Sequence, residues 1–212
     1  MLISVIGGRI IPSFTRNWLV KRGAATLPSP ASAVDKLALA TLHAGMFGWV
    51  LLPSFQPLGA LLLIAAVCNL WRLVRWRGAA TVSGPLLLVL HIGYAWLVAG
   101  AGVLGLSILD PGVPVSAAIH ALTAGAFATM ILAVMTRATR GHTGGTLSAD
   151  RGTLLIYLGV TLAAATRIAA VCATGWTLSL LIWSGCLWIV GFGGFVLLYG
   201  PMLLGRHPLD LK

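Results

Sequence analysis

The stretch from 84 to 108, GPLLLVLHIGYAWLVAGAGVLGLSI, holds no Asp, Glu, Lys or Arg. A helix needs roughly 20 apolar residues to cross the hydrocarbon core of a bilayer, so this stretch predicts a transmembrane helix. Similar runs predict further spans at 33–52, 56–74, 114–137, 152–172 and 176–203. Residues 1–13 are interpreted as the final half of one more helix. We therefore expect an all-α, polytopic transmembrane helical bundle with about six full spans and a shortened first helix.

The composition of the whole chain supports this fold class. The 212 residues are 58% hydrophobic and only 8% charged, with a mean hydropathy of +0.98. A soluble fold of this composition would have too little polar surface, so the lipid bilayer is the expected partner. Because no repeat, low-complexity tract or soluble linker divides the sequence, residues 1–212 are interpreted as a single transmembrane domain.

Basic residues alternate between the predicted links. Most of the Lys and Arg residues lie in the C-terminal tail and in the links at 14–34, 72–83 and 137–151. No Lys or Arg lies in the links at 53–55, 109–113 and 173–175. This alternation is typical of the positive-inside rule, which places the basic links and the C-terminus in the cytoplasm and the N-terminus outside. The formal charge of +10 is scattered over helix ends instead of forming one stripe, which argues against nucleic acid as a partner.

An external N-terminus on a half-length helix has a further implication. We expect the sequence to begin partway through a larger membrane protein, with the missing N-terminal helices supplied by a separate partner chain. This expectation rests on hydropathy and charge together.

Ionisable residues inside a membrane are costly and therefore indicate function. His43, His91 and His120 lie within apolar runs, Arg167 lies inside the span at 152–172, and Arg9 lies in the first helix. The chain has no Glu, and its four Asp residues fall at helix ends or in links. Proton-coupled pumps usually need membrane carboxylates, whereas neutral imidazole is a common ligand of haem iron, copper and zinc. The pattern therefore favours a haem or metal site.

His120 and Arg167 are expected to share a layer of the membrane. His120 lies roughly 9 Å inside its span at about 1.5 Å per residue, and Arg167 is similarly close to the same end of the next span. A haem needs an axial imidazole and a cation for its propionates, so this pair is the leading candidate. The alternative for Arg167 is that it extends toward the headgroups.

The other histidines are separate candidates. His91 is predicted to lie in the opposite leaflet, so it cannot share one metal with His120, and Tyr94 lies on the same side of its helix. His43 is predicted near the middle of the membrane and is the weakest candidate. Each imidazole alone could instead hydrogen-bond a neighbouring helix, a contact worth about 1 kcal/mol.

Two further patterns concern the span at 114–137 and the link after it. His142 lies in Arg140-Gly141-His142-Thr143-Gly144-Gly145-Thr146, where glycines permit an anion-binding nest of backbone amides or a flexible solvated loop. Small residues recur at four-residue spacing and predict a close helix contact: Ala117, Ala121, Gly125 and Thr129.

Three stretches together resemble the NnrS family. They are GGRIIPSFTRN at 7–17, HIGYAW at 91–96 and HALTAGAFATMILAVMTRATRGHTGGT at 120–146. The resemblance implies a bacterial inner-membrane protein of about twelve helices, associated with haem and copper and with resistance to nitric oxide and nitrosative stress. By this resemblance, residues 1–212 correspond to the second half of such a twelve-helix protein. It covers nearly the whole chain, although Gly145 stands where the family pattern would have a basic residue.

The sequence thus predicts a haem-binding membrane protein of the nitric oxide response, with copper as a second expected cofactor. The expected cofactor-binding residues are His91, His120, Arg167, Arg9, Arg137 and His142. The expected metal ligands are His91, His120 and His43. The alternative is a transporter or membrane scaffold without a cofactor, whose histidines only join helices.

Overall fold

The computed structural model describes residues 1–144 and 146–205 and is helical throughout this part of the chain. The helices are α1 (Leu2–Lys21), α2 (Ala33–Leu51), α3 (Gln56–Arg75), the 3-10 turn η1 (Gly78–Thr81), α4 (Pro85–Leu109), α5 (Val115–His120), η2 (Ala121–Phe127), α6 (Ala128–His142), α7 (Arg151–Cys172), η3 (Thr174–Trp176) and α8 (Thr177–Leu203). Because α5, η2 and α6 follow one another without a break, they form one long helix, of which η2 is a π-helical segment.

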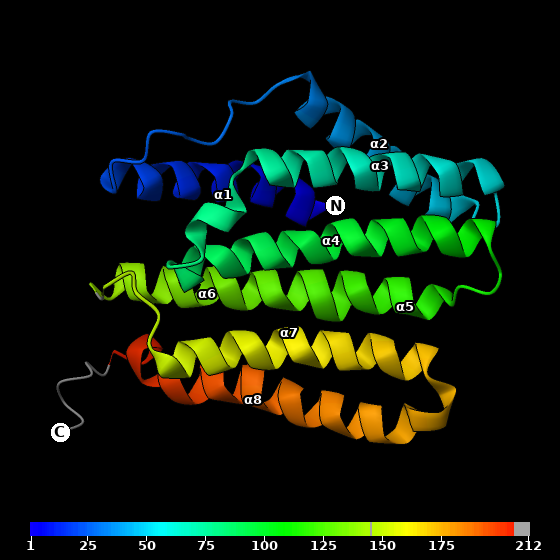
Figure 1. Ribbon diagram of the computed structural model, residues 1–212. Helices are drawn as coiled ribbons and strands as arrows, with labels where there is room; N and C mark the ends of the chain where they lie inside the picture. The colour runs from blue at the N-terminus through cyan, green and yellow to red at the C-terminus, as the bar shows by residue number, and fades with distance from the viewer. Residues whose placement is uncertain (145, 206–212) are drawn as a thin grey trace.

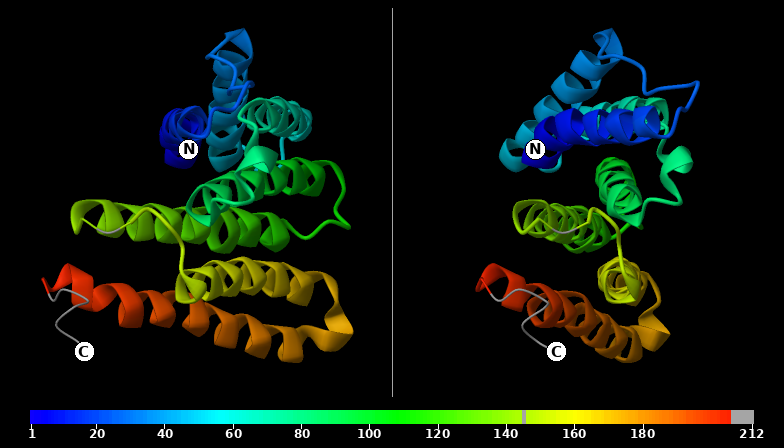
Figure 2. Two further views of the ribbon diagram at one scale, coloured as in Figure 1. Left: turned by 60° about the vertical axis from the view of Figure 1, so that its left-hand side comes forward. Right: turned by 90° about the vertical axis from the view of Figure 1, so that its left-hand side faces the viewer.

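The helices lie in three tiers (Figures 1 and 2). One outer tier contains α1, α2 and α3, the middle tier contains α4 and the α5–η2–α6 helix, and the other outer tier contains α7 and α8. In Figure 1 the α6–α7 link, η1 and the end of α1 lie at the left-hand end of the bundle. The links without Lys or Arg lie at the right-hand end, as the charge pattern predicted. We call these ends the basic end and the neutral end.

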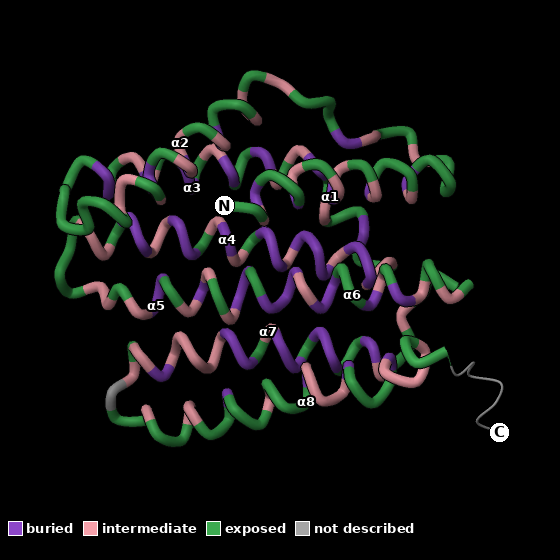
Figure 3. The backbone as a smooth tube through the Cα atoms, turned by 180° about the vertical axis from the view of Figure 1, so that it is seen from behind, coloured by how far each residue is buried: buried purple, intermediate pink, exposed green. Residues whose placement is uncertain are grey.

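The predicted spans agree closely with the helices. By length and composition, five helices of the described chain can cross a membrane: α3, α4, the α5–η2–α6 helix, α7 and α8. The all-α membrane bundle is therefore confirmed. Figure 3 shows many buried residues along α4 and mostly exposed ones along α8, so α4 is the central helix and α8 offers a wide apolar face to lipid.

Two predicted boundaries are wrong. Helix α1 continues beyond residue 13 to Lys21, although it contains Pro12, so residues 14–21 of the expected link at 14–34 are helical. The helix predicted to end at residue 137 continues to His142. Hydropathy misses both extensions because their last turns carry the basic residues that belong at a membrane surface.

Small residues let the helices approach closely, as predicted for the ridge in the α5–η2–α6 helix. Its members are all buried: Ala117, Ala121, Gly125 and Thr129. Backbones also approach closely at the α7–α8 contact, where a Cβ on Gly159 would lie 3.0 Å from both the Gly191 nitrogen and the Leu187 carbonyl oxygen. Backbones at this distance leave no room for a side chain, so the glycine fixes the spacing of the two helices.

We expect Gly159→Val to lower the stability of the protein by about 1–3 kcal/mol, the usual effect of overpacking. Thermal unfolding of the purified protein in detergent measures the change. Gly185→Val in α8 is the matched control, because a Cβ there meets nothing within 4 Å. Equal melting temperatures for the two variants would contradict the close α7–α8 contact.

Candidate functional site

His120 and Arg167 meet near the neutral end of the bundle. His120 is the last residue of α5, and Arg167 comes from the last part of α7. The Arg167 Nε lies 3.4 Å from His120 Nε2, and both residues are half-buried. Because an arginine Nε–H can only donate, His120 Nε2 accepts and its Nδ1 carries the proton of the neutral ring. The predicted shared layer is confirmed.

The π-helix η2 begins immediately after His120. A π-helical segment widens the helix by an extra residue per turn and often occurs at functional sites. Here its inner side packs directly on α4, because a Cβ on Gly125 would lie only 2.7 Å from the Trp96 ring. The packing of Gly125 on Trp96 therefore brings together the stretches 91–96 and 120–146, two of the three that resemble the family.

His91 lies near the basic end, separate from His120. It is 5% exposed, and its Nε2 lies 3.0 Å from the hydroxyl oxygen of Thr15 in α1. Its Nδ1 is buried without a hydrogen-bond partner, and a Cβ on Gly78 would lie 2.7 Å from it. The backbone of η1 therefore closes over this nitrogen and leaves no room for a macrocycle.

His43 is half-buried on α2. Its Nδ1 donates to the carbonyl oxygen of Leu39, one turn earlier in the same helix, over 2.7 Å. This bond fixes the tautomer and leaves the lone pair on Nε2, the arrangement that ligating histidines commonly have. The same bond also satisfies the ring without any ligand, so it does not decide between the two interpretations.

The three intramembrane histidines do not gather into one centre. Within residues 1–144 and 146–205, no three His, Cys, Asp or Glu side chains form a group that could hold a metal ion. A haem needs only an imidazole for its iron and a cation for its propionates. The residue types of His120 and Arg167 fit these two needs. The histidines predicted to bind copper do not belong to such a group among the described residues, and copper binding stays a prediction.

The remaining predicted residues lie elsewhere. Arg9 is exposed on α1. Arg137 lies over the Phe14 ring, 4.3 Å from its centroid, and is 17 residues beyond His120, or about 25 Å at 1.5 Å per residue. Arg137 and His120 therefore belong to different sites.

The predicted glycine-rich nest is only partly a loop. His142 is exposed and is the last residue of α6, so the helix takes up the first residues of the predicted turn. Gly144 follows with a φ of +71°, a conformation that glycine adopts readily, and Gly145 lies outside the described residues. The helical His142 corrects the expectation that it lies in the link.

A buried polar cluster around Arg72 was not predicted. Its Nε donates to Asp35 Oδ1 over 2.8 Å, and one terminal nitrogen donates to the Tyr94 hydroxyl over 2.9 Å. The Tyr94 hydroxyl donates in turn to Asn69 Oδ1 over 2.6 Å, and Arg75 also bonds Asp35. The cluster joins α2, α3 and α4, and the Tyr94 hydroxyl bonds Arg72 and Asn69 in it instead of the His91 ring.

One signal in the sequence points to this cluster. Asn69 and Arg72 lie three residues apart and therefore share one face of α3, a polar pair in an otherwise apolar run. The positive-inside pattern assigned Arg72 to a surface link instead. In the structure its side chain is only 4% exposed.

A second polar cluster joins α6, α7 and α8 at the basic end. Arg140 donates to Asp150 and, over 2.9 Å, to the Tyr199 hydroxyl. Partial burial alone would raise the pKa of the Asp150 carboxyl, but hydrogen bonds from the Thr153 amide and hydroxyl and from Arg140 hold that pKa below its ordinary value. Asp150 is thus a charged N-cap of α7, fixed against Arg140 of α6 at the basic end.

Comparison with known proteins indicates a family. A family model described as NnrS protein matches residues 1–207, nearly the whole chain. No curated protein and no solved structure matches the chain. The family match confirms the resemblance that the three sequence stretches indicated.

We expect Asp35→Asn to destabilise the protein by about 3–5 kcal/mol, because it leaves the buried Arg72 charge without its carboxylate. Thermal unfolding in detergent measures this loss. Asp110→Asn is the control, since Asp110 lies in an exposed link and accepts from the Gly112 amide, a bond that Asn can keep. A melting temperature of Asp35→Asn that is no lower than that of Asp110→Asn would disprove the role of the cluster.

Proposed function

Because the chain belongs to the NnrS family, a membership that suggests a membrane protein of the nitric oxide response, we propose that it binds haem in the bacterial inner membrane. The observation that carries the proposal is the pairing of His120 with Arg167 at 3.4 Å. His120 is the proposed axial ligand, and Arg167 is the proposed partner of a haem carboxylate.

The charge of Arg167 supports an anionic partner. Its hydrogen bond goes to a neutral imidazole, and in the described part of the chain no carboxylate pairs with it. A cation at membrane depth is costly unless an anion or a polar cavity meets it. The guanidinium can hold a carboxylate by two parallel hydrogen bonds, so a propionate would complete the charge balance that the chain itself leaves open.

The hydrogen bond between the pair has a consequence for ligation. Arg167 donates to His120 Nε2, so the lone pair of this nitrogen is engaged. Coordination through Nε2 requires Arg167 to release the ring, which at the same time frees the guanidinium for an anion. When bound, haem would supply an iron centre that binds small gaseous ligands. The half-buried position of His120 leaves its ring accessible from the bundle surface.

The orientation of the proposed site follows from the charge pattern. The basic links meet at one end of the bundle (Figure 1), and we assign this end, with the end of α8, to the cytoplasm. The His120–Arg167 pair then lies toward the external face. The N-terminus is assigned to the outside by the same rule.

A second candidate function is a transporter or scaffold without a cofactor. The specific observation in its favour is that His91 and His43 already have hydrogen-bond partners, Thr15 and the Leu39 carbonyl. In that case His120 would have the same structural role toward Arg167. The two candidates differ in whether the purified chain binds haem.

We expect the purified chain, titrated with haem in detergent, to develop a Soret band, and His120→Ala to lose it. The loss follows from removal of the proposed axial imidazole. His43→Ala, which removes an imidazole bonded within its own helix, serves as the matched control and should keep the band. A wild-type chain that stays colourless when haem is supplied would favour the second candidate function.

Arg167→Leu tests the charge partner separately. A hydrogen bond to a charged group is worth about 1.5–3 kcal/mol, so this variant should bind haem about ten- to a hundredfold more weakly in the same titration, while the imidazole remains. Arg151→Gln, an exposed arginine at the start of α7, should bind as the wild type does. An unchanged affinity in Arg167→Leu would mean that its side chain only reaches toward the headgroups.

A further inference from the structure

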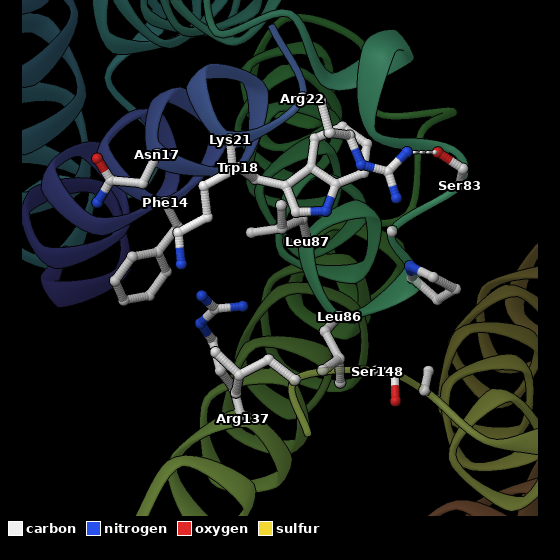
Figure 4. A pocket seen from close by; sticks show the side chains of 14 residues that line it. Phe14, Asn17, Trp18, Lys21, Arg22, Ser83, Leu86, Leu87, Arg137 and Ser148 are labelled. Carbon is white, nitrogen blue, oxygen red and sulfur yellow. Dashed lines mark hydrogen bonds between the residues drawn. The ribbon is translucent and has the colours of Figure 1, made fainter. Parts of the chain in front are cut away.

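A cavity of about 360 Å³ lies between the ends of α1, α4 and α6 at the basic end. Three of the residues that line it are cationic: Lys21, Arg22 and Arg137. Figure 4 shows the Lys21 and Arg137 head groups directed into the same space from two different helices. Among the residues that the structure describes, no Asp or Glu lines the cavity.

The cations are held in place by aromatic rings and a hydroxyl. The Arg22 guanidinium lies over the Trp18 ring, 3.9 Å from its centroid, and donates to the Ser83 hydroxyl over 3.1 Å. Arg137 lies over the Phe14 ring. Contacts with ring faces position a guanidinium without neutralising it, so most of its N–H donors remain available.

The positive charge in this cavity is not compensated by any residue in the described part of the chain. Among the described residues, the ion pairs involve only Arg72, Arg75 and Arg140 as cations, and none of these lines the cavity. Two like charges that converge on one space repel each other unless an anion lies between them. The geometry therefore calls for an anionic ligand with several acceptor oxygens.

We propose that this cavity binds the phosphate of an anionic phospholipid headgroup. Basic pockets between transmembrane helices on the cytoplasmic side are suited to such headgroups, and this cavity lies at the basic end of the bundle. Leu86 and Leu87 line it beside the cations, which gives an apolar wall for the part of the lipid below the phosphate. A free phosphate compound would offer the same oxygens but would leave this wall unused.

The cavity is distinct from the proposed haem site and goes beyond the proposed function. Arg137 is about 25 Å along the helix from His120 at 1.5 Å per residue. Lipid binding here therefore does not depend on whether the protein binds haem.

The test uses the full purified chain in neutral detergent, titrated with short-chain phosphatidylglycerol, short-chain phosphatidylcholine or inorganic phosphate. Retained lipid is counted by native mass spectrometry, and stability is followed by thermal unfolding. Phosphatidylglycerol should bind and raise the melting temperature. At about 1 kcal/mol per cation near a membrane surface, Lys21→Gln should weaken this binding about fivefold, and Lys21→Gln with Arg137→Gln should weaken it further.

Controls make each outcome decisive. Arg151→Gln removes an exposed cation outside the cavity and should bind phosphatidylglycerol as the wild type does. Lys21 is exposed, so its single substitution remains informative if the double variant does not fold. Phosphatidylglycerol binding that is equal in Lys21→Gln and Arg151→Gln would overturn the proposal. Inorganic phosphate that stabilises the wild type as strongly as phosphatidylglycerol would overturn the lipid assignment and indicate a soluble phosphate compound.

Discussion

The shortage of carboxylates constrains the whole structure. The chain has 14 Lys and Arg residues against four Asp and no Glu, and a buried charge in a bilayer must find its partner within the protein or in a ligand. Asp35 forms ion pairs with Arg72 and Arg75, and Asp150 forms one with Arg140. The first of these clusters joins α2, α3 and α4. The second joins α6 to α7 and, through Tyr199, to α8. Two of the four acidic residues thus join helices of the bundle.

Cations without a carboxylate then mark where a ligand is needed. At the neutral end, Arg167 hydrogen-bonds the His120 imidazole and has no carboxylate partner among the described residues; we propose that a haem with anionic side groups meets this charge. At the basic end, Lys21, Arg22 and Arg137 line a cavity that no described acidic residue lines, and we propose a phosphate there. The two sites lie at opposite ends of the α5–η2–α6 helix, so one helix carries a residue of each. Both proposals therefore follow from the same charge balance.

Hydropathy predicted the fold well because the length of each apolar run is set by the membrane, and helix ends agree within a few residues for α2, α3, α4, α7 and α8. It also placed His120 and Arg167 at the same depth, since depth follows from position along a helix. It missed the Arg72–Asp35 cluster because the direction of a side chain around its helix depends on tertiary packing. For the same reason it did not show that η1 covers His91, or that a cavity separates Lys21 from Arg137.

We propose that His120 binds the haem iron and that His43 and His91 do not. Electron paramagnetic resonance of the haem-loaded chain, prepared with ¹⁵N-labelled histidine, tests it most directly through the coupling of the iron to a ligand nitrogen. We expect a coupling between the iron and an imidazole nitrogen that is still present when His43 and His91 are both replaced by Ala. A spectrum without any imidazole coupling, or a coupling that disappears with His91, would contradict it.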